Sequence, residues 1–361
     1  MEMKRYSKLI LIFFAIGRIF SPFYAMIMRF RAYLYARGAF KQHRLPAFVI
    51  SVGNITIGGT GKTPLVQNLA AKVLHLGLKP AIISRGYAGK AKQQINIVSN
   101  EKEIFLNAVD AGDEPRLLAE NLPGVPVLTG LNRAIPGYHA VHKLGADCII
   151  LDDGFQHLGV KRDVDLVLFN ADAPLGTNRV LPGGDLREPL DALQRADGYV
   201  ITGITDGNRK NVSLLQRHLE KRFPGKPFFL GEYTPVPHLK KGEDHLITSI
   251  PISEVLELPF YAFCGIANPE SFKNLLDCHN FTINGFSTFQ DHHLYTKKNI
   301  CALHDRAQDS GAQALLTTSK DFVKLKSMMP MDMPIFSLDI ELVLDASFDD
   351  FLAQRLDNFN K

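Results

Sequence analysis

The chain has 361 residues, of which 46% are hydrophobic and 22% charged, as is usual for a globular protein long enough for two domains. Its four cysteines lie far apart and include no C-x-x-C pair, which excludes a disulfide framework and a zinc site of that type and favours a reducing compartment. Charge is uneven: nine of the 41 lysines and arginines but one of the 37 acidic residues lie in residues 1–50, so this segment supplies the net charge of +4.

Residues 1–45 form the first predicted unit, in which Arg18 separates two apolar stretches, 9–17 and 19–28. A spanning helix needs about 20 apolar residues, and Arg18 near its centre would cost about 2.5–3.5 kcal/mol. We therefore expect a helix or hairpin on an anionic membrane surface, with a single spanning helix as the alternative. The apolar residues favour lipid over nucleic acid as partner, and no clear A-x-A site indicates a cleaved signal peptide.

A glycine-rich loop lies between a predicted strand over 48–52 and a predicted helix over 65–76. In that setting glycines let backbone N–H groups surround a polyphosphate, and the helix N-terminus adds a favourable dipole. Lys62 is expected to reach the β- and γ-phosphates of ATP, and Thr63 to ligate Mg²⁺. Thr56 replaces the first glycine of the general pattern G-x-x-x-x-G-K-[ST], and the added glycine pair can supply its flexibility. The expected ATP-binding residues are Thr56, Ile57, Gly58, Gly59, Thr60, Gly61, Lys62 and Thr63.

The chain then alternates short apolar runs with helical stretches, which predicts a P-loop kinase domain over 46–230. Because the runs are apolar on both faces, we expect an α/β fold with a mostly parallel sheet and helices on both sides. Its further predicted strands cover residues 81–84, 125–129, 148–151, 165–169 and 199–202.

The pattern changes over 231–258, where prolines and a Lys-Gly-Glu-Asp stretch predict a linker that contains a hairpin. A smaller α/β domain is expected over 259–361, with a helix that starts at Asn268 and Pro269. Its predicted strands cover residues 261–264, 281–286 and 314–317.

Polar residues follow several predicted strands, at the sheet edge where α/β folds bind their ligands. Asp152 and Asp153 end a hydrophobic strand, as in the Walker B arrangement, and are expected to hold Mg²⁺, with an Asp-Gly turn as the alternative. Arg85 can clamp a phosphate or remain a solvated loop charge, and Arg187 can meet the substrate or the γ-phosphate. The expected substrate contacts are Tyr87, Gln156 and Glu188.

Two candidates concern acid–base chemistry. Asp113 precedes a helical stretch over 116–121, where it can cap the helix or accept a proton from a hydroxyl group. His292 and His293 are adjacent and do not share a helix or strand face, which argues against a metal chelate and for one imidazole bound to a carboxylate. Residues 317–321 end another predicted strand and are expected to form a further contact loop.

In order along the chain, these motifs resemble those of the tetraacyldisaccharide 4′-kinase family, the lipid A 4′-kinases of Gram-negative bacteria. Each motif alone is weak, but the ordered set covers nearly the whole chain and is specific. A small hydroxyl residue at the position of Thr56 is usual in that family. The matching stretches are SVGN at 51–54, GGTGKTP at 58–64, SRGY at 84–87, GDEP at 112–115, LDDGFQH at 151–157, LREP at 186–189 and DH at 291–292.

The resemblance implies an ATP- and Mg²⁺-dependent monotopic enzyme on the cytoplasmic face of the bacterial inner membrane. It implies transfer of the γ-phosphoryl group to the 4′-hydroxyl of a tetraacyl glucosamine disaccharide 1-phosphate in lipid A biosynthesis, with no obligate protein partner. It also implies that Asp113 is the base and His292 its partner, although the doublet leaves His293 open. Lys62, Arg85 and Arg187 are expected to stabilise the transferring phosphoryl group.

Two other classes of nucleotide-binding protein share parts of the pattern. A membrane-associated switch ATPase of the MinD/ParA type carries a lysine just before G-G-x-G-K-[ST], and this chain has Ile57 there. A regulatory GTPase needs an N-K-x-D guanine motif, which the sequence lacks. We therefore predict a lipid kinase, with the switch ATPase as the alternative.

Overall fold

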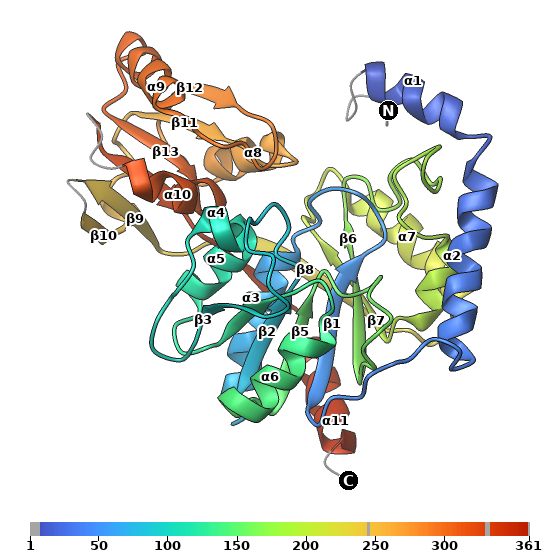
Figure 1. The fold of residues 1–361 in the computed structure, drawn as a ribbon. Coiled ribbons are helices and arrows are strands. Elements are labelled where there is room, and N and C mark those ends of the chain that lie inside the picture. The colour runs from blue at the N-terminus through green and yellow to red at the C-terminus, as the bar shows by residue number, and fades with distance from the viewer. Residues whose placement is uncertain (1–7, 244–245, 329–332, 360–361) are drawn as a thin grey trace.

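The computed structural model describes residues 8–243, 246–328 and 333–359. They form two α/β lobes and an N-terminal pair of helices (Figure 1). We call the nine-stranded sheet and its helices the large lobe, and the six-stranded sheet and its helices the small lobe. The strand order is β15-β8-β7-β6-β1-β5-β2-β4-β3 in the large lobe and β10-β9-β14-β13-β11-β12 in the small lobe.

The large-lobe sheet is parallel except at its two edges, where β3 and β15 pair antiparallel. This confirms the predicted α/β class, and each strand predicted there is present with bounds shifted by one or two residues at most. The strands are β1 (Phe48–Asn54), β2 (Pro80–Ser84), β3 (Asn96–Ser99), β4 (Val127–Thr129), β5 (Cys148–Asp152), β6 (Val164–Asn170), β7 (Gly198–Thr202), β8 (Phe228–Pro235) and β15 (Ile340–Leu344).

Helices cover both faces of this sheet because the strands are apolar on both sides. Along β1, Ile50 and Val52 face one helix layer, whereas Val49 faces the other. The first layer contains α3 (Lys62–His75), α4 (Ala108–Ala111), α5 (Asp113–Asn121) and α11 (Ser347–Phe359), and the second contains α6 (Ala134–Leu144), η2 (Leu190–Arg195) and α7 (Arg209–Arg222).

The small lobe is a second, mixed sheet with its own apolar clusters on both faces. Its helix α8 starts at Pro269, as predicted, although Asn268 makes no side-chain capping bond. The strands are β9 (His238–Glu243), β10 (Leu246–Pro251), β11 (Phe260–Cys264), β12 (Ile283–Thr288), β13 (Ala314–Thr318) and β14 (Ile335–Leu338), and the helices are η3 (Ile252–Glu254), α8 (Pro269–Cys278), α9 (Lys297–Asp309), α10 (Ser319–Leu325) and η4 (Lys326–Met328).

The pairing of strands differs from the predicted boundaries at two places. The hairpin of β9 and β10 lies inside the stretch predicted as a linker, but it belongs to the small-lobe sheet. The last strand and helix, predicted as part of the second domain, return to the large lobe, where β15 pairs with β8. Leu342 and Phe348 of this returning segment are buried, so it covers a sheet edge that would otherwise be open.

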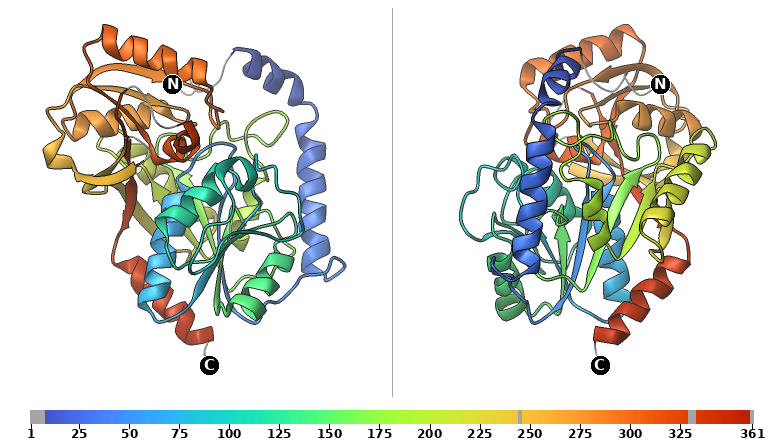
Figure 2. Two further views of the ribbon diagram at one scale, coloured as in Figure 1. Left: turned by 60° about the vertical axis from the view of Figure 1, so that its left-hand side comes forward. Right: turned by 90° about the vertical axis from the view of Figure 1, so that its right-hand side faces the viewer.

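The N-terminal helices are α1 (Lys8–Gly17) and α2 (Ser21–Ala36), and α2 runs along one side of the large lobe (Figure 2). Two hydroxyl groups of α2 donate to loop carbonyls: Ser21 to Val180 and Tyr24 to Arg187, each at 2.9 Å. Among the described residues no single helix is long and apolar enough to cross a membrane, whereas this pair, bent by 71°, passes the same test of length and composition together.

Candidate functional site

The glycine-rich loop lies at the carboxyl end of β1, between the ends of β5 and β6. From β1 the chain continues to β2 on one side of the sheet, whereas from β6 it continues to β7 on the other side. Ligands of α/β sheets bind at the point where the strand order reverses in this way. Gly61, with φ +78°, forms the N-cap of α3, so the loop turns directly into the helix. Lys62 is the first residue of that helix, and its Nζ lies 3.4 Å from both Asn54 Oδ1 and Asp153 Oδ1.

Other parts of the loop are fixed by neighbouring segments. Thr56 is buried and bridges to Leu186, and the N–H of Ile57 donates to the Asp185 carbonyl at 2.8 Å. The carbonyl of Thr60 accepts a hydrogen bond from the Thr202 hydroxyl at 3.0 Å. Of the remaining candidates, Gly58 and Gly59 lie between β1 and α3, and Thr63 is the second residue of α3, so the predicted ATP-binding residues all lie at the β1–α3 junction.

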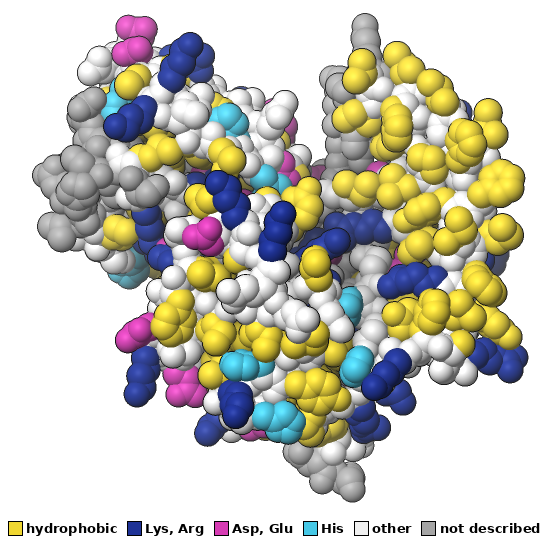
Figure 3. All heavy atoms as spheres, viewed as in Figure 1, with side chains coloured by type: hydrophobic (Ala, Val, Ile, Leu, Met, Phe, Trp, Pro, Cys, Tyr) yellow, Lys and Arg dark blue, Asp and Glu magenta, His cyan; other side chains and the backbone are white. Residues whose placement is uncertain are grey.

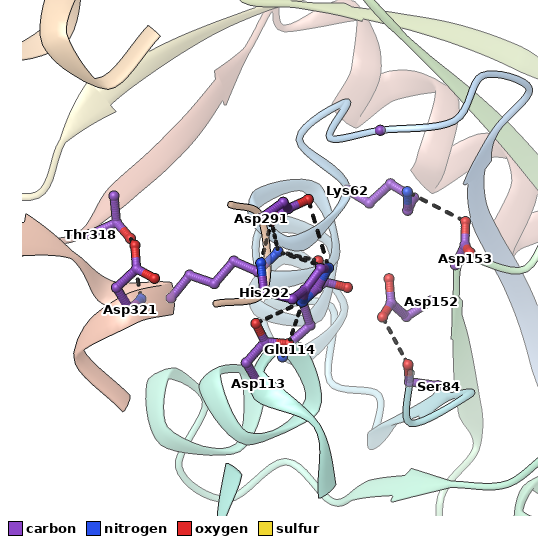
Figure 4. A network of polar contacts seen from close by, with 12 residues as sticks. Lys62, Ser84, Asp113, Glu114, Asp152, Asp153, Asp291, His292, Thr318 and Asp321 are labelled. Carbon is purple, nitrogen blue, oxygen red and sulfur yellow. Dashed lines mark hydrogen bonds and ion pairs between the residues drawn. The ribbon is translucent and has the colours of Figure 1, made fainter. Parts of the chain in front are cut away.

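Asp152 and Asp153 end β5 beside this loop but occupy different environments (Figure 4). Asp152 is 1% exposed, accepts a hydrogen bond from Ser84 Oγ at 3.0 Å, and has no partner for its second oxygen among the described residues. Burial, followed by the charges of Glu114 and Asp153, raises the pKa of Asp152 to about 7. Burial also acts on Asp153, but Lys62 and Arg187 outweigh it and lower its pKa to about 2.

This arrangement fits a divalent cation. A buried carboxylate oxygen without a partner is costly unless a cation or a hydrogen-bond donor satisfies it, and Mg²⁺ prefers oxygen ligands from one or two carboxylates together with phosphate. Asp152 has such an oxygen, and Asp153 lies next to it beside Lys62. The strand end therefore offers a cation site directly beside the phosphate loop.

The LREP loop supplies a second cation to the same edge. Arg187 donates to both carboxylate oxygens of Asp153 at 2.9 and 2.8 Å and lies 3.4 Å from Gln156 Oε1. Gln156 in turn donates to the Asn54 carbonyl at 2.8 Å. Glu188, a predicted substrate contact, is buried and paired with Arg195 at 3.0 Å, so here it orients an arginine instead of facing solvent.

Asp113 and His292 come from different lobes and meet directly. Nδ1 of His292 lies 3.0 and 2.9 Å from the two Asp113 oxygens, while Nε2 of His293 contacts Asn299 Oδ1 at 3.2 Å. The structure thus pairs His292, not His293, with the aspartate. His292 adopts φ +60°, a strained region that accumulates at functional sites. Asp113 does not cap α5, whose N-cap is Gly112, although its Oδ1 accepts the N–H of Glu114 at 3.0 Å.

The acid–base pair is electrostatically polarised. Burial alone would raise the pKa of Asp113, but the hydrogen bond to His292 and the charges of Lys320, His292 and Lys324 lower it below its usual value. The bond to Asp113 raises the pKa of His292, while burial and Lys320 oppose that rise. Asp113 therefore stays ionised, and a neutral His292 must carry its proton on Nδ1, because the carboxylate can only accept.

Two loop candidates lie beside the site without firm contacts to it. The ring of Tyr87 is 66% exposed and lies 5.4 Å from the His292 ring, centroid to centroid. Arg85 is exposed, and its charge acts on Arg133, a buried arginine whose Nη2 reaches the Asp153 carbonyl at 3.5 Å. Arg133 was missed in the sequence, because a single arginine at a helix start gives no signal of burial.

Three further residues of the site were also missed. Ser84 binds Asp152, Tyr233 of β8 lies against Gly61, and Lys320 contacts the acid–base pair. The stretch 317–321 was expected only as a contact loop, and Lys320 belongs to it. Ser84 belongs to the matching stretch SRGY, but its bond to Asp152 and the position of Tyr233 depend on which strands become neighbours, which no local pattern shows.

Comparison with known proteins points to one family. A model of the tetraacyldisaccharide-1-P 4′-kinase family matches residues 14–357. Proteins named tetraacyldisaccharide 4′-kinase are similar: that of Desulfotalea psychrophila is 43% identical over 97% of this chain and 99% of its own, and that of Syntrophus aciditrophicus is 38% identical over 90% and 87%. A crystal structure of the apo form of LpxK from Aquifex aeolicus in complex with ATP superposes with a TM-score of 0.72, at 31% identity over 93% of this chain and 97% of that one. Since the match is nearly complete in sequence and in fold, this chain belongs to the tetraacyldisaccharide 4′-kinase family.

Proposed function

We propose that this protein transfers the γ-phosphoryl group of ATP to the 4′-hydroxyl of a tetraacyl disaccharide 1-phosphate. The observation that carries the proposal is the juxtaposition in Figure 4: a phosphate-loop lysine and a carboxylate pair on one side, and an aspartate–histidine pair on the other. The first set suits a triphosphate, and the second suits activation of a hydroxyl group. A switch ATPase has no use for the second set.

The roles of the residues follow from their positions. The loop amides and Lys62 bind the phosphates. Arg187, which pairs with Asp153, stabilises the negative charge that develops on the γ-phosphoryl group. The oxygen of the sugar hydroxyl forms a bond to phosphorus, the bond from the β–γ bridging oxygen to that phosphorus breaks, and ADP leaves. Asp113 accepts the hydroxyl proton, and Nδ1–H of His292 holds the carboxylate in place.

Asp152, Asp153 and Thr63 would hold Mg²⁺, which would supply charge neutralisation at the phosphate oxygens when bound. One observation supports this assignment: among the described residues, the second oxygen of the buried Asp152 carboxylate has no hydrogen-bond partner. A cation at this position removes the penalty of ionising Asp152. The ion pairs of Asp153 with Lys62 and Arg187 leave its charge available to the same site.

We also propose that α1 and α2 lie on the cytoplasmic surface of the bacterial inner membrane, where the acyl chains of the substrate are embedded. Figure 3 shows hydrophobic side chains gathered over these two helices. Ile16 is 64% and Ile19 72% exposed, and Arg18, Arg29 and Arg31 lie among such residues. An apolar surface of this extent bordered by arginines suits anionic lipid.

A direct assay tests the proposed activity. Purified protein is incubated with γ-labelled ATP, Mg²⁺ and tetraacyl disaccharide 1-phosphate, and label is expected in the lipid. The same incubation without lipid, or with a disaccharide that already carries a 4′-phosphate, should leave the lipid fraction unlabelled. Label released only as inorganic phosphate, together with ATP-dependent dimerisation, would instead favour the switch ATPase.

A further inference from the structure

Lys320, the first lysine of α10, lies at the centre of the interface between the two lobes. Its Nζ contacts Glu114 Oε1 of the large lobe at 3.1 Å, and Asp291 Oδ1 of its own lobe at 3.3 Å. The same nitrogen lies 3.4 Å from Nε2 of His292. One ammonium group therefore touches a residue from each lobe and the free side of the histidine ring.

The chemistry of these contacts is directional. An ammonium group has three donors and no acceptor, so the ring nitrogen that faces it must be the acceptor. Asp113, on the other side of the ring, can only accept and so requires the proton on Nδ1. Lys320 and Asp113 thus favour the same neutral form of His292, protonated on Nδ1 and unprotonated on Nε2.

Asp291 makes the lysine necessary. Its Oδ2 lies 3.8 Å from Nε2 of His292, so without Lys320 the ring would stand between two carboxylates. Such a position favours a doubly protonated, positively charged imidazole. A positive ring would hold Asp113 as an ion pair and make that carboxylate a weaker base. Lys320 neutralises the charge of Asp291. Its own positive charge beside Nε2 also disfavours a positively charged imidazole.

On the basis of the proposed kinase function, we propose that Lys320 is a positioning residue that joins the lobes through Glu114 and favours the neutral form of His292 that carries its proton on Nδ1. The charged and titratable groups that surround the imidazole come from α5, α10 and two loops. They are Asp113, Glu114, Lys320, Lys324, Asp291 and Tyr87.

A pH titration of His292 tests the proposal without ATP or lipid. In ¹⁵N NMR spectra of the full chain, the wild type should show a pyridine-type Nε2 and a protonated Nδ1 at pH values above the pKa of His292. In Lys320→Met, and equally in Lys320→Gln, the pKa of His292 should rise by about one unit or more. Adding Asp291→Asn to Lys320→Met should return the pKa of His292 toward the wild-type value. The reason is that Asp291 is the carboxylate whose charge Lys320 neutralises in the wild type.

Lys326→Met is the matched control. Lys326 pairs with Glu120 Oε2 at 2.6 Å, so it crosses the same interface from the same helical segment without touching the acid–base pair. This variant should leave the His292 titration unchanged. In kinase assays the acid limb of the kcat profile should move to higher pH in Lys320→Met and stay in place in Lys326→Met.

The outcomes separate the two proposals. An unchanged His292 titration in a folded Lys320→Met or Lys320→Gln protein overturns the role of Lys320, and so does an equal shift in Lys326→Met. Failure of the wild type to phosphorylate lipid overturns the kinase proposal, while the NMR titration keeps its meaning because it needs no substrate.

Discussion

Gly61→Ala is the sharpest test of how the phosphate loop is held. Gly61 has φ +78°, which costs an alanine roughly 1–2 kcal/mol. A Cβ there would also overlap the hydroxyl group of Tyr233 and lie 2.8 Å from its Cζ, and overpacking of this kind costs about 1–3 kcal/mol. Because Tyr233 is fixed in the large-lobe sheet, we expect the free energy of unfolding to fall by roughly 2–5 kcal/mol and ATP binding to weaken.

Gly77→Ala separates the two terms. Gly77 follows the other end of the same helix with φ +80°, and a Cβ there meets nothing within 4 Å. The free energy of unfolding of Gly77→Ala, measured by urea denaturation, should therefore fall only by the cost of the backbone conformation, about 1–2 kcal/mol. In a Tyr233→Ala background, Gly61→Ala should cost less stability than it costs in the wild type, because the overlap with the tyrosine is gone. If both glycine variants lose the same stability, the contact between Tyr233 and the loop does not constrain it.

Three other predictions follow from the site and the N-terminal helices. Lys62→Ala and Asp113→Ala should each lower kcat about 10²–10⁴-fold, with unchanged circular dichroism, because each removes a group that acts on the reacting atoms. Asp152→Asn should stabilise the metal-free protein by roughly 2–4 kcal/mol at pH 8, because burial of the ionised carboxylate raises its folded pKa to about 7, above the unfolded value. This gain in stability should decrease below pH 7 and vanish near pH 4, where the carboxyl group is protonated in both states. Replacing Phe13 and Ile16 by serine should weaken the affinity for anionic vesicles, measured by co-sedimentation, roughly 100-fold.

Each of these has a control in the same part of the chain. Lys72→Ala in α3 and Asp110→Ala in α4 remove matched charges and should keep kcat close to the wild-type value. Leu76→Ser and Leu214→Ser remove exposed apolar side chains elsewhere and should keep vesicle binding. Near-normal turnover of Asp113→Ala would exclude it as the base, and a pH-independent effect of Asp152→Asn would contradict the burial argument.

The sequence predicted most where local chemistry decides the structure. The phosphate loop needs glycines, a lysine and a helix start in one continuous stretch, so the sequence predicts residues 56–63 directly, and the structure has them at the junction of a strand and a helix as expected. The core strands were identified because they are apolar on both faces, which requires burial between two helix layers. The second domain was drawn too long, because the final strand and helix carry no mark of which sheet they join.

Pairing across long separations was beyond pattern reasoning alone. Asp113 and His292 are 179 positions apart, and their pairing was inferred through a family resemblance, not from spacing. Glu188 was expected to contact the substrate because it lies in the LREP motif. In the structure its buried carboxylate instead pairs with Arg195, seven residues later. That outcome depends on the short η2 helix, which the apolar pattern did not reveal.

The assembled acid–base pair shows where the energy of its alignment comes from. Asp113 and His292 lie within 3.0 Å of each other although they come from different lobes, so contacts between the lobes contribute to their alignment. Lys320 of α10 provides such a contact, since it pairs with Glu114 of α5 and also touches His292. Adjacent pairing of β8 and β15 adds a second constraint, because both chain crossings between the lobes then lie side by side. Alignment that the protein's own contacts hold does not have to come from the binding of the lipid, so more of that binding energy is available for the transition state.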